Sequence, residues 1–585
     1  MRYTLKASKP EAHLFGVVLE VDRPDSAGQR LTLPAWTPGS YMVRDFARHV
    51  IELSASRDGQ PVTVEKIDKQ TWRCAPCDGP LRIEWRIYAK DASVRAAALD
   101  DEGGFCNGSS VFLQPLNVDD GPFELEIASP DRDGWRAATA MTAVDVDKQG
   151  FGLYRAGDYE ELIDHPIRLG HFSRYGFEVQ GVPHEVIVSG NPRFDDERLC
   201  RDLARACDSH VELFGELPVS HYIFFMNIVG SGYGGLEHRA STLLDVARAS
   251  LPQPGDDDQR EDYRELLGLC SHEYFHLWHV KRIRPAAFVP YDLSEERYTT
   301  LLWAFEGMTS YYDDLGLLRA GLLPRNAWLE QMARTITRVH RGPGRLRQKV
   351  TESSFDAWTR FYKQDENAPN AIVSYYAKGA LIALALDLTL RAGTGGDCSL
   401  DDLMRALWQR HGKRDVGVDE DAIERLAAEV SGLDLGDFFA HALRSTIDLD
   451  LAGLLAQFGI DLDWTTATAS AGYVPRMAAY LRDDGGLPRL LRLIEDGAAQ
   501  RAGLAAGDRL VAIDRVHLPG GSFGERVDRL PVAEPLVTHV LRDDRLLVRE
   551  LVLDEPARDQ CRLQWREDCG HATANRRAAW LGEAP

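Results

Sequence analysis

The stretch with the clearest chemical potential carries two histidines and a glutamate in an H-E-x-x-H pattern, at His272, Glu273 and His276. In a helix, residues four positions apart lie on one face, so both imidazoles can reach the same metal ion. In catalytic zinc sites a neighbouring carboxylate takes a proton from water that the metal has made acidic. The pattern therefore predicts one Zn²⁺ per chain and hydrolytic chemistry. The alternative is a pair of ordinary histidines on the polar face of an amphipathic helix.

A catalytic zinc site needs a third protein ligand, and two glutamates downstream are candidates. Glu295 has the spacing from His276 that many zinc aminopeptidases use, but Asp292 to Glu295 resembles a capping box at the start of a helix. Glu306 is the only carboxylate in the apolar and aromatic segment 302–312, which we expect to be helical. A lone buried carboxylate is costly unless it is paired or bound to a metal, so we predict that Glu306 is the third ligand.

Further motifs occur along the chain in segments 36–48 (Trp-Thr-Pro-Gly-Ser-Tyr at its start), 234–238 (Gly-Gly-Leu-Glu-His), 280–285, 303–312 and 375–380. With these motifs, which span nearly the whole chain, the sequence resembles the glycyl aminopeptidase family of zinc metallopeptidases. The resemblance implies a thermolysin-like catalytic domain and peptide substrates with a free N-terminus. It also implies that small N-terminal residues such as Gly and Ala are favoured.

The Gly-Gly-Leu-Glu-His motif follows the apolar run 222–229, so we expect Gly234, Gly235 and Glu237 on or just after a strand. The edge of such a strand can align an extended peptide through main-chain hydrogen bonds. By the resemblance, Glu237 would bind the terminal ammonium of the substrate and so reject internal peptide bonds. His238 replaces an Asn of related enzymes, which leaves the geometry of the amine pocket open. The alternative for Glu237 is a solvated loop carboxylate.

A Tyr-x-Lys-Gly segment at residues 376–379 implies, by the same resemblance, that the phenol of Tyr376 donates a hydrogen bond to the tetrahedral oxyanion. The neighbouring Tyr375 competes for this role. Adjacent helical residues point about 100° apart, so only one of the two rings can face the site. The motif favours Tyr376, and the other ring would then fill the core.

Composition and length favour a multidomain α+β enzyme. The chain has 585 residues, more than one hydrophobic core supports, and 44% of them are hydrophobic. The formal net charge of -22 argues against a nucleic-acid surface. Neither a signal peptide nor a membrane-spanning stretch is recognisable, so we expect no membrane partner and a cytoplasmic location. The nine cysteines fit a reducing compartment, and we interpret the single C-x-x-C, at Cys74 and Cys77, as incidental. The oligomeric state stays open.

Five regions are predicted along the chain. Alternating apolar and polar residues indicate an N-terminal β-domain over 1–175, followed by the thermolysin-like catalytic domain over 176–310 and its helical part over 311–455. Residues 460–556 resemble a PDZ domain, with a short helix ending near Gly503, a tight turn at Gly507 and Asp508, and then a strand. Such a domain can bind a peptide end or serve only as a packing module. A polar tail covers 557–585.

Two other functions stay possible on the sequence alone. A thermolysin-like endopeptidase would share the zinc site but lack the amine anchor. A noncatalytic scaffold would use the PDZ-like region to bind peptides. The presence of Glu273 together with all three ligand candidates argues against a decayed site, so we favour an aminopeptidase.

Overall fold

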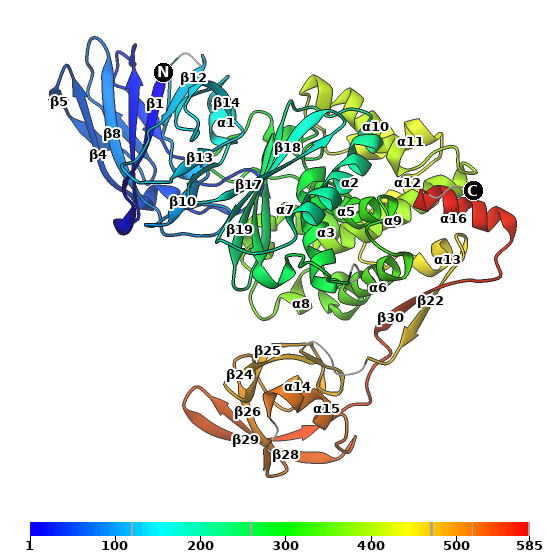
Figure 1. Cartoon of the computed structure of the whole chain (residues 1–585). Coiled ribbons are helices and arrows are strands. Elements are labelled where there is room, and N and C mark those ends of the chain that lie inside the picture. The colour runs from blue at the N-terminus through cyan, green and yellow to red at the C-terminus, as the bar shows by residue number, and fades with distance from the viewer. Residues whose placement is uncertain (119–120, 258–259, 468–471, 518, 583–585) are drawn as a thin grey trace. The chain divides into compact units, whose positions relative to one another are not determined.

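The computed structural model describes the chain except residues 119–120, 258–259, 468–471, 518 and 583–585 (Figure 1). The chain forms two compact units, and neither is one continuous stretch of sequence. The first unit comprises Met1–Tyr298, Tyr312–Leu323 and Met404–Ile423, and the second comprises Thr299–Tyr311, Pro324–Leu403 and Glu424–Pro585. In the described part of the chain, no helix combines the length and apolar character needed to cross a membrane.

The first unit begins with the predicted β-rich domain, drawn in blue in Figure 1. Strand β8 (Leu81–Tyr88) shows why the sequence folds this way, because its residues are alternately buried and exposed along its whole length. The largest sheet has the order β14 (Thr142–Val146), β15 (Gly152–Ala156), β12 (Phe123–Ile127), β1 (Arg2–Lys9), β2 (Leu14–Val21), β8 (Leu81–Tyr88), β4 (Val50–Arg57) and β5 (Gln60–Val62).

Two four-stranded sheets complete the β-rich domain. One has the order β13 (Arg136–Ala138), β16 (Ile167–Gly170), β10 (Gly103–Cys106) and β9 (Ala97–Leu99), and the other has the order β11 (Gln114–Pro115), β3 (Arg30–Thr32), β7 (Thr71–Cys74) and β6 (Val64–Lys66). All nine cysteines are free. Cys74 lies within β7, where burial raises the pKa of its thiol to about 12. A thiol that stays protonated is unreactive, which agrees with an incidental C-x-x-C.

A five-stranded sheet follows in the same unit. Its order is β17 (Ser173–Val179), β18 (Val182–Ser189), β19 (Tyr222–Val229), β21 (Ser241–Ala247) and β20 (Tyr233–Glu237). The strands β18, β19 and β21 are parallel, whereas β20 runs antiparallel to β21 and forms one edge. A shared apolar core, which includes Phe105, Phe172, Phe225 and Leu236, joins this sheet to the β-rich domain. The motif strand β20 is therefore an edge strand, as a peptide-aligning role requires.

Helices of the first unit cover this sheet. Helix α2 (Asp196–Phe214) packs on β17 and on α3 (Glu261–Phe275), and α3 in turn packs on β20 and β21. Buried aromatic rings fix α3 in place, with Phe275 stacked on Tyr312 and Tyr274 stacked on Phe224. The short helix α1 (Tyr159–Ile163) belongs to the same unit. The helix that carries the H-E-x-x-H motif is thus packed directly against the edge strand.

The second unit is mainly helical around the apolar helix α9 (Tyr375–Gly393), which is buried along most of its length. α4 (Leu302–Phe305), α6 (Arg325–Arg341), α7 (Val350–Phe355) and α13 (Leu451–Ala456) pack against it. The other helices of this region are α5 (Gly307–Arg319), α8 (Ala368–Ala371), α10 (Leu400–Arg410), α11 (Ala422–Ser431) and α12 (Gly436–Arg444). Of these, α5, α10 and α11 extend across the boundary between the units. This part of the chain is therefore mainly helical.

A separate sheet with its own apolar core lies near the C-terminus. The predicted short helix, turn and strand are present as α14 (Ala498–Arg501), the residues around Gly507, and β26 (Arg509–Ile513). The sheet has the order β23 (Tyr473–Val474), β24 (Ala479–Asp484), β25 (Leu487–Leu493), β26 (Arg509–Ile513), β28 (Pro535–Arg542) and β29 (Arg545–Val552), with β27 (Val516–His517) paired to β26. Helix α15 (Phe523–Val527) completes this part.

The segment predicted as a polar tail is ordered over its described residues. Strand β30 (Gln560–Trp565) pairs with β22 (Ile460–Thr465), and α16 (His571–Leu581) follows. Trp580 of α16 is fully buried, and its indole nitrogen donates a hydrogen bond to the Tyr311 hydroxyl at 2.8 Å. The polar composition hid these apolar contacts, because two buried side chains of α16, Trp580 and Leu581, are enough to dock the helix.

Candidate active site

The two histidines of the H-E-x-x-H motif lie at the C-terminal end of α3. The helix ends at Phe275, and His276 is its C-cap residue with helical backbone angles. The relation between positions i and i+4 is therefore kept, and the Nε2 atoms of His272 and His276 lie 3.1 Å apart. Both imidazoles thus converge on one point, as the sequence predicts.

Each ring is held through its other nitrogen. The Nδ1 atom of His272 lies 2.9 Å from a carboxylate oxygen of Asp313, and that of His276 lies 2.7 Å from the carbonyl oxygen of His279. Asp313 belongs to α5, and burial raises the pKa of its carboxyl while the bond with His272 acts in the opposite direction. A carboxylate or carbonyl behind a ligating histidine fixes the tautomer and the orientation of its ring.

These partners decide whether the rings fit a metal ion. With acceptors facing both Nδ1 atoms, each neutral ring carries its proton there and keeps a lone pair on Nε2. Two lone pairs 3.1 Å apart repel each other unless a cation lies against both. Two nitrogens bound at about 2.0–2.1 Å to one tetrahedral zinc ion would be about 3.3 Å apart. The arrangement of His272 and His276 therefore fits a zinc ion.

Glu273 lies against the edge strand β20. A Cβ atom at Gly235 would lie 2.1 Å from the Glu273 carboxylate, so only glycine fits at this position of the strand. Gly234 precedes Gly235 in the strand. The carbonyl oxygen of Gly235 accepts a long hydrogen bond of 3.5 Å from the Arg95 side chain. The two glycines therefore let α3 and its carboxylate approach the strand that the sequence predicts to align the substrate.

Glu237 ends the same strand and is almost fully buried, with 4% of its surface exposed. One of its carboxylate oxygens has no hydrogen-bond partner among the described residues. Glu237, Glu273 and His276 form a group whose potential ligand atoms all lie within 4.8 Å of one another. A buried carboxylate oxygen left without a partner costs free energy, unless a cation or a donor binds there. The alternative that Glu237 is a solvated loop carboxylate is excluded.

A turn of the β-rich domain closes over Glu237. Thr37 and Ser40 pair across a tight turn in which Gly39 has a φ of +86°, following Pro38. A Cβ atom at Gly39 would lie 2.4 Å from a Glu237 oxygen. Proline followed by glycine is typical of a type II turn, and here the glycine is also needed for the close approach. The Trp-Thr-Pro-Gly motif thereby gains a structural role that sequence reasoning missed.

A buried polar network lies next to Glu237. Asp164 accepts a hydrogen bond from the Lys281 ammonium at 2.8 Å, and its carboxylate lies 3.0 Å from Nδ1 of His238. Burial disfavours the charged carboxylate, but Lys281 and His238 outweigh it and hold the pKa of Asp164 well below its usual range. Burial lowers the pKa of His238. The contact with Asp164 therefore fixes the orientation of the His238 ring.

Glu306 lies in the second unit, at the junction between α4 and α5, and is 2% exposed. Its position depends on a close crossing with α9. A Cβ atom at Gly307 would lie 2.4 Å from Cα of Gly379, and one at Gly379 would lie 2.4 Å from the Trp303 carbonyl oxygen. The glycine of the Tyr-x-Lys-Gly segment thus lets the helix of Glu306 touch the helix of Tyr376. The predicted burial of Glu306 is confirmed.

The two tyrosines at the start of α9 differ in exposure. Tyr375 is fully buried, whereas Tyr376 is partly exposed, and their rings stack with centroids 4.8 Å apart. Ser374 caps the helix by accepting a hydrogen bond from the Ala377 amide at 3.2 Å. Burial and the charge of Glu306 raise the pKa of Tyr376 well above its usual value, so its hydroxyl stays a neutral donor. This difference in exposure favours Tyr376 over Tyr375 as the ring available to a substrate.

The prediction of a helix beginning near Asp292 is wrong. Residues 291–299 are not helical, and Glu295 is exposed, with its carboxylate 3.7 Å from Arg297. The Asp292 side chain accepts hydrogen bonds from the backbone and hydroxyl of Ser294 at 2.9 and 2.6 Å. Such local bonds compete with helix formation. Glu295 therefore has neither the capping role nor the burial expected of a metal ligand.

Comparison with known proteins agrees with this description. Residues 2–171 match the model of the peptidase M61 N-terminal domain, and residues 265–382 match the model of the M61 glycyl aminopeptidase. An aminopeptidase N family protein from Idiomarina loihiensis is 37% identical over 99% of both chains, with a TM-score of 0.95. No curated protein sequence matches significantly.

More distant solved structures include the M1 zinc metallopeptidase of Deinococcus radiodurans bound to a Tyr-Ser-Ala substrate. It is 15% identical, covering 77% of this chain and 94% of that one, with a TM-score of 0.47. Yeast LTA4 hydrolase is 14% identical, covering 78% of this chain and 70% of that one, with a TM-score of 0.47.

The family matches and the site together define a metallopeptidase. The chain belongs to the M61 glycyl aminopeptidase family, to which the matched N-terminal and catalytic segments and the Idiomarina structure all connect it.

Proposed function

We propose that this protein is a zinc-dependent aminopeptidase that removes single residues from the N-terminus of peptides. The observation that carries the proposal is the buried carboxylate of Glu237, which has one oxygen without a partner among the described residues and lies beside Glu273 and His276. A terminal ammonium is the substrate group that would satisfy this oxygen. An internal segment of a peptide brings no such cation to the site.

His272, His276 and Glu306 would hold the zinc ion, since they offer two imidazole nitrogens and one carboxylate, a donor set of catalytic zinc sites. A bound zinc ion supplies Lewis acidity, which makes water acidic enough to lose a proton near neutral pH and polarises a carbonyl group. Asp313 and the His279 carbonyl would keep the two imidazoles in the ligating tautomer.

Glu273 would act as the general base and then as the general acid. It directly follows His272, between the two histidine ligands in the sequence, and it faces β20 rather than forming part of the predicted ligand set. From this position its carboxylate would take the proton of the attacking water and pass it to the leaving amine. The Tyr376 hydroxyl, kept neutral by its raised pKa, would donate a hydrogen bond to the oxyanion that forms.

The edge strand β20 would align the substrate. Its outer side has no neighbouring strand in the described sheet, so an extended peptide could add main-chain hydrogen bonds there. Gly234 and Gly235 would allow close approach of the substrate backbone. A preference for glycine at the N-terminus is supported by the description of the matched glycyl aminopeptidase family, and we extend the proposal to alanine as another small residue.

A thermolysin-like endopeptidase would need a cleft that is open on both sides of the scissile bond. The Gly39 turn, which lies against Glu237, opposes this alternative. We also propose that the C-terminal sheet is a PDZ-like packing module in a thermolysin-like enzyme. Asp508 in its turn is fully buried and paired with Arg542 at 2.8 Å, a structural use of the motif.

The proposal is tested with glycyl and alanyl reporter substrates and their N-acetylated forms, with and without a chelator. We expect hydrolysis of the free amines only, about one zinc per chain by elemental analysis, and loss of both metal and turnover after chelation. Equal hydrolysis of the acetylated substrates would refute the aminopeptidase assignment. Full metal content in a His272→Ala/His276→Ala double variant would refute the metal assignment.

A further inference from the structure

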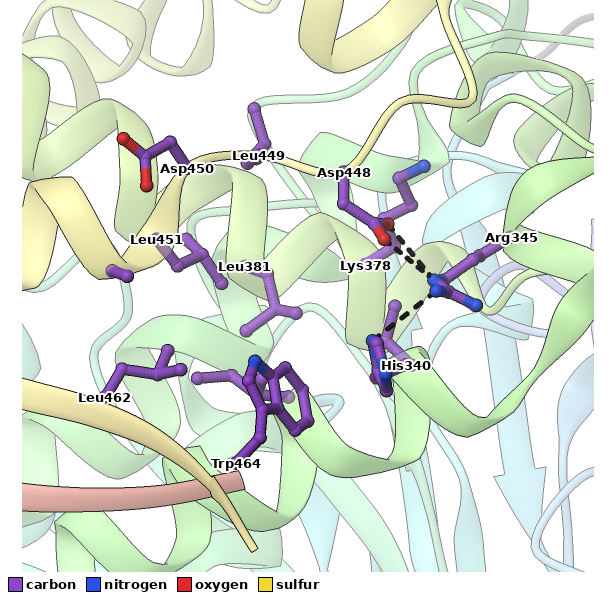
Figure 2. Close-up of a pocket in the computed structure, with 13 residues that line it drawn as sticks. His340, Arg345, Lys378, Leu381, Asp448, Leu449, Asp450, Leu451, Leu462 and Trp464 are labelled. Carbon is purple, nitrogen blue, oxygen red and sulfur yellow. Dashed lines mark hydrogen bonds and ion pairs between the residues drawn. The ribbon is translucent and has the colours of Figure 1, made fainter. Parts of the chain in front are cut away.

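A second pocket, of about 240 Å³, lies within the second unit, between α6, α9, α13 and β22 (Figure 2). Apolar side chains form one part of it, chiefly Leu381, Leu451 and Leu462. Polar side chains gather at the opposite end, where Lys378, Arg345 and Asp448 are drawn in Figure 2. The pocket therefore has an apolar body and a charged end, which is the composition of a small-molecule site.

Lys378 is the unusual member of this charged end. It is only 4% exposed, and its ammonium has no hydrogen-bond partner among the described residues. Burial lowers its pKa, which Asp448 partly counteracts and Arg345 reinforces. An ammonium buried without a partner carries a desolvation cost that an anionic partner would offset, so Lys378 is the group of this pocket best suited to bind an anion.

The other charges of the pocket are already paired. Asp448 lies 3.0 Å from Arg345, and Asp450 caps α13 by accepting a hydrogen bond from the Gly453 amide at 2.9 Å. Burial and the nearby Arg345 lower the pKa of His340, which favours its neutral form. Both acidic residues are exposed, whereas Lys378 is buried and the Arg345 side chain is only 12% exposed. The inner end of the pocket is consequently positive.

The apolar part of the pocket suits a ring or a branched chain. The rings of Trp464 and His340 pack with centroids 4.1 Å apart and form one wall, as Figure 2 shows. The volume lies just below the range of about 300–1,000 Å³ that is usual for drug-sized ligands. The occupant would therefore be small, with one anionic group and an apolar body.

This pocket is distinct from the candidate active site. Lys378 follows Tyr376 by two positions in α9, and residues two apart in a helix point to roughly opposite sides. None of the predicted metal ligands or catalytic residues lines the pocket. We propose that it binds a small monocarboxylate with an apolar aliphatic or aromatic body, whose carboxylate pairs with Lys378.

The proposal is tested by isothermal titration of the full chain with 3-phenylpropionate and with the uncharged 3-phenyl-1-propanol. We expect the carboxylate to bind at least about tenfold more tightly, because only the carboxylate can form a charged hydrogen bond with the buried ammonium. Lys378→Met should abolish this preference while keeping the affinity for the alcohol. Lys363→Met, at an exposed lysine outside the pocket, is the matched control and should change nothing.

A second variant keeps the proposal testable if Lys378→Met does not fold. Trp464→Ala removes part of the apolar wall and should weaken both ligands by similar factors. No binding of 3-phenylpropionate to the unaltered protein would overturn the proposal. Equal affinities for the two ligands, or an unchanged preference in a folded Lys378→Met variant, would overturn the assignment of Lys378. Neither result depends on peptidase activity.

Discussion

Replacing Glu237 by glutamine tests how the enzyme would recognise a peptide end. The substitution keeps the size of the side chain and one acceptor oxygen but removes the charge from a site that is 4% exposed. The nearby Lys281 stays paired with Asp164, so no other buried charge loses its main partner. Losing one member of a buried charge pair costs about 2–5 kcal/mol, and the remaining acceptor places the expected loss at about 2–4 kcal/mol.

That loss corresponds to a decrease in kcat/KM of about 30- to 900-fold, at 1.36 kcal/mol for each factor of ten. Steady-state kinetics with free and N-acetylated alanyl substrates would measure it, and zinc content should stay unchanged. The variant should also discriminate less between the two substrates. Glu178→Gln, at an exposed position of β17, is the matched control. An unchanged preference for the free amine in Glu237→Gln would show that another carboxylate binds the ammonium.

Three further substitutions test the rest of the site. Glu306→Ala should remove zinc and activity, whereas Glu295→Ala, at an exposed position, should keep both by metal analysis and turnover; the reverse result would refute our choice of ligand. Asp313→Asn should weaken zinc binding about 10- to 100-fold in competition with a chelator, with the exposed Asp101→Asn as control, and an unchanged affinity would refute its orienting role. Gly379→Ala should lower the free energy of unfolding by about 1–3 kcal/mol, because its Cβ would meet the Trp303 carbonyl, while Gly121→Ala, in open space, should not; equal denaturation midpoints would contradict the close crossing.

The sequence predicted those parts of the molecule whose evidence is local. Alternation in residues 81–88 predicted a half-buried strand, and the run 222–229 predicted the strand before the Gly-Gly-Leu-Glu-His motif; both are present. The prediction that Glu306 is buried is also confirmed, because a carboxylate within a segment of apolar and aromatic residues is buried together with its neighbours. The roles of Glu306, Tyr376 and Glu237 in metal and substrate binding stay predictions.

The remaining features depend on contacts that no short pattern contains. Asp313 and Asp314 are adjacent carboxylates, and only the packing of α5 against α3 decides that Asp313 faces His272. The Gly39 turn meets Glu237 across almost 200 positions of sequence, where a turn motif carries no information about its partner. The capping box near Asp292 failed for a different reason, since its side chain bonds to Ser294 in a local turn instead.

The Gly39 turn changes how the β-rich domain should be regarded. Part of the wall around Glu237 comes from a segment that precedes the catalytic helix by more than 200 residues. If Glu237 binds the terminal ammonium as proposed, the domain takes part in substrate recognition and is not an appended module. Exchanging it for the equivalent domain of a relative would transplant part of the specificity, and removing it would hydrate the carboxylate. On this proposal, a catalytic fragment without the domain would still contain its reactive side chains, but it would no longer distinguish the end of a peptide from an internal segment.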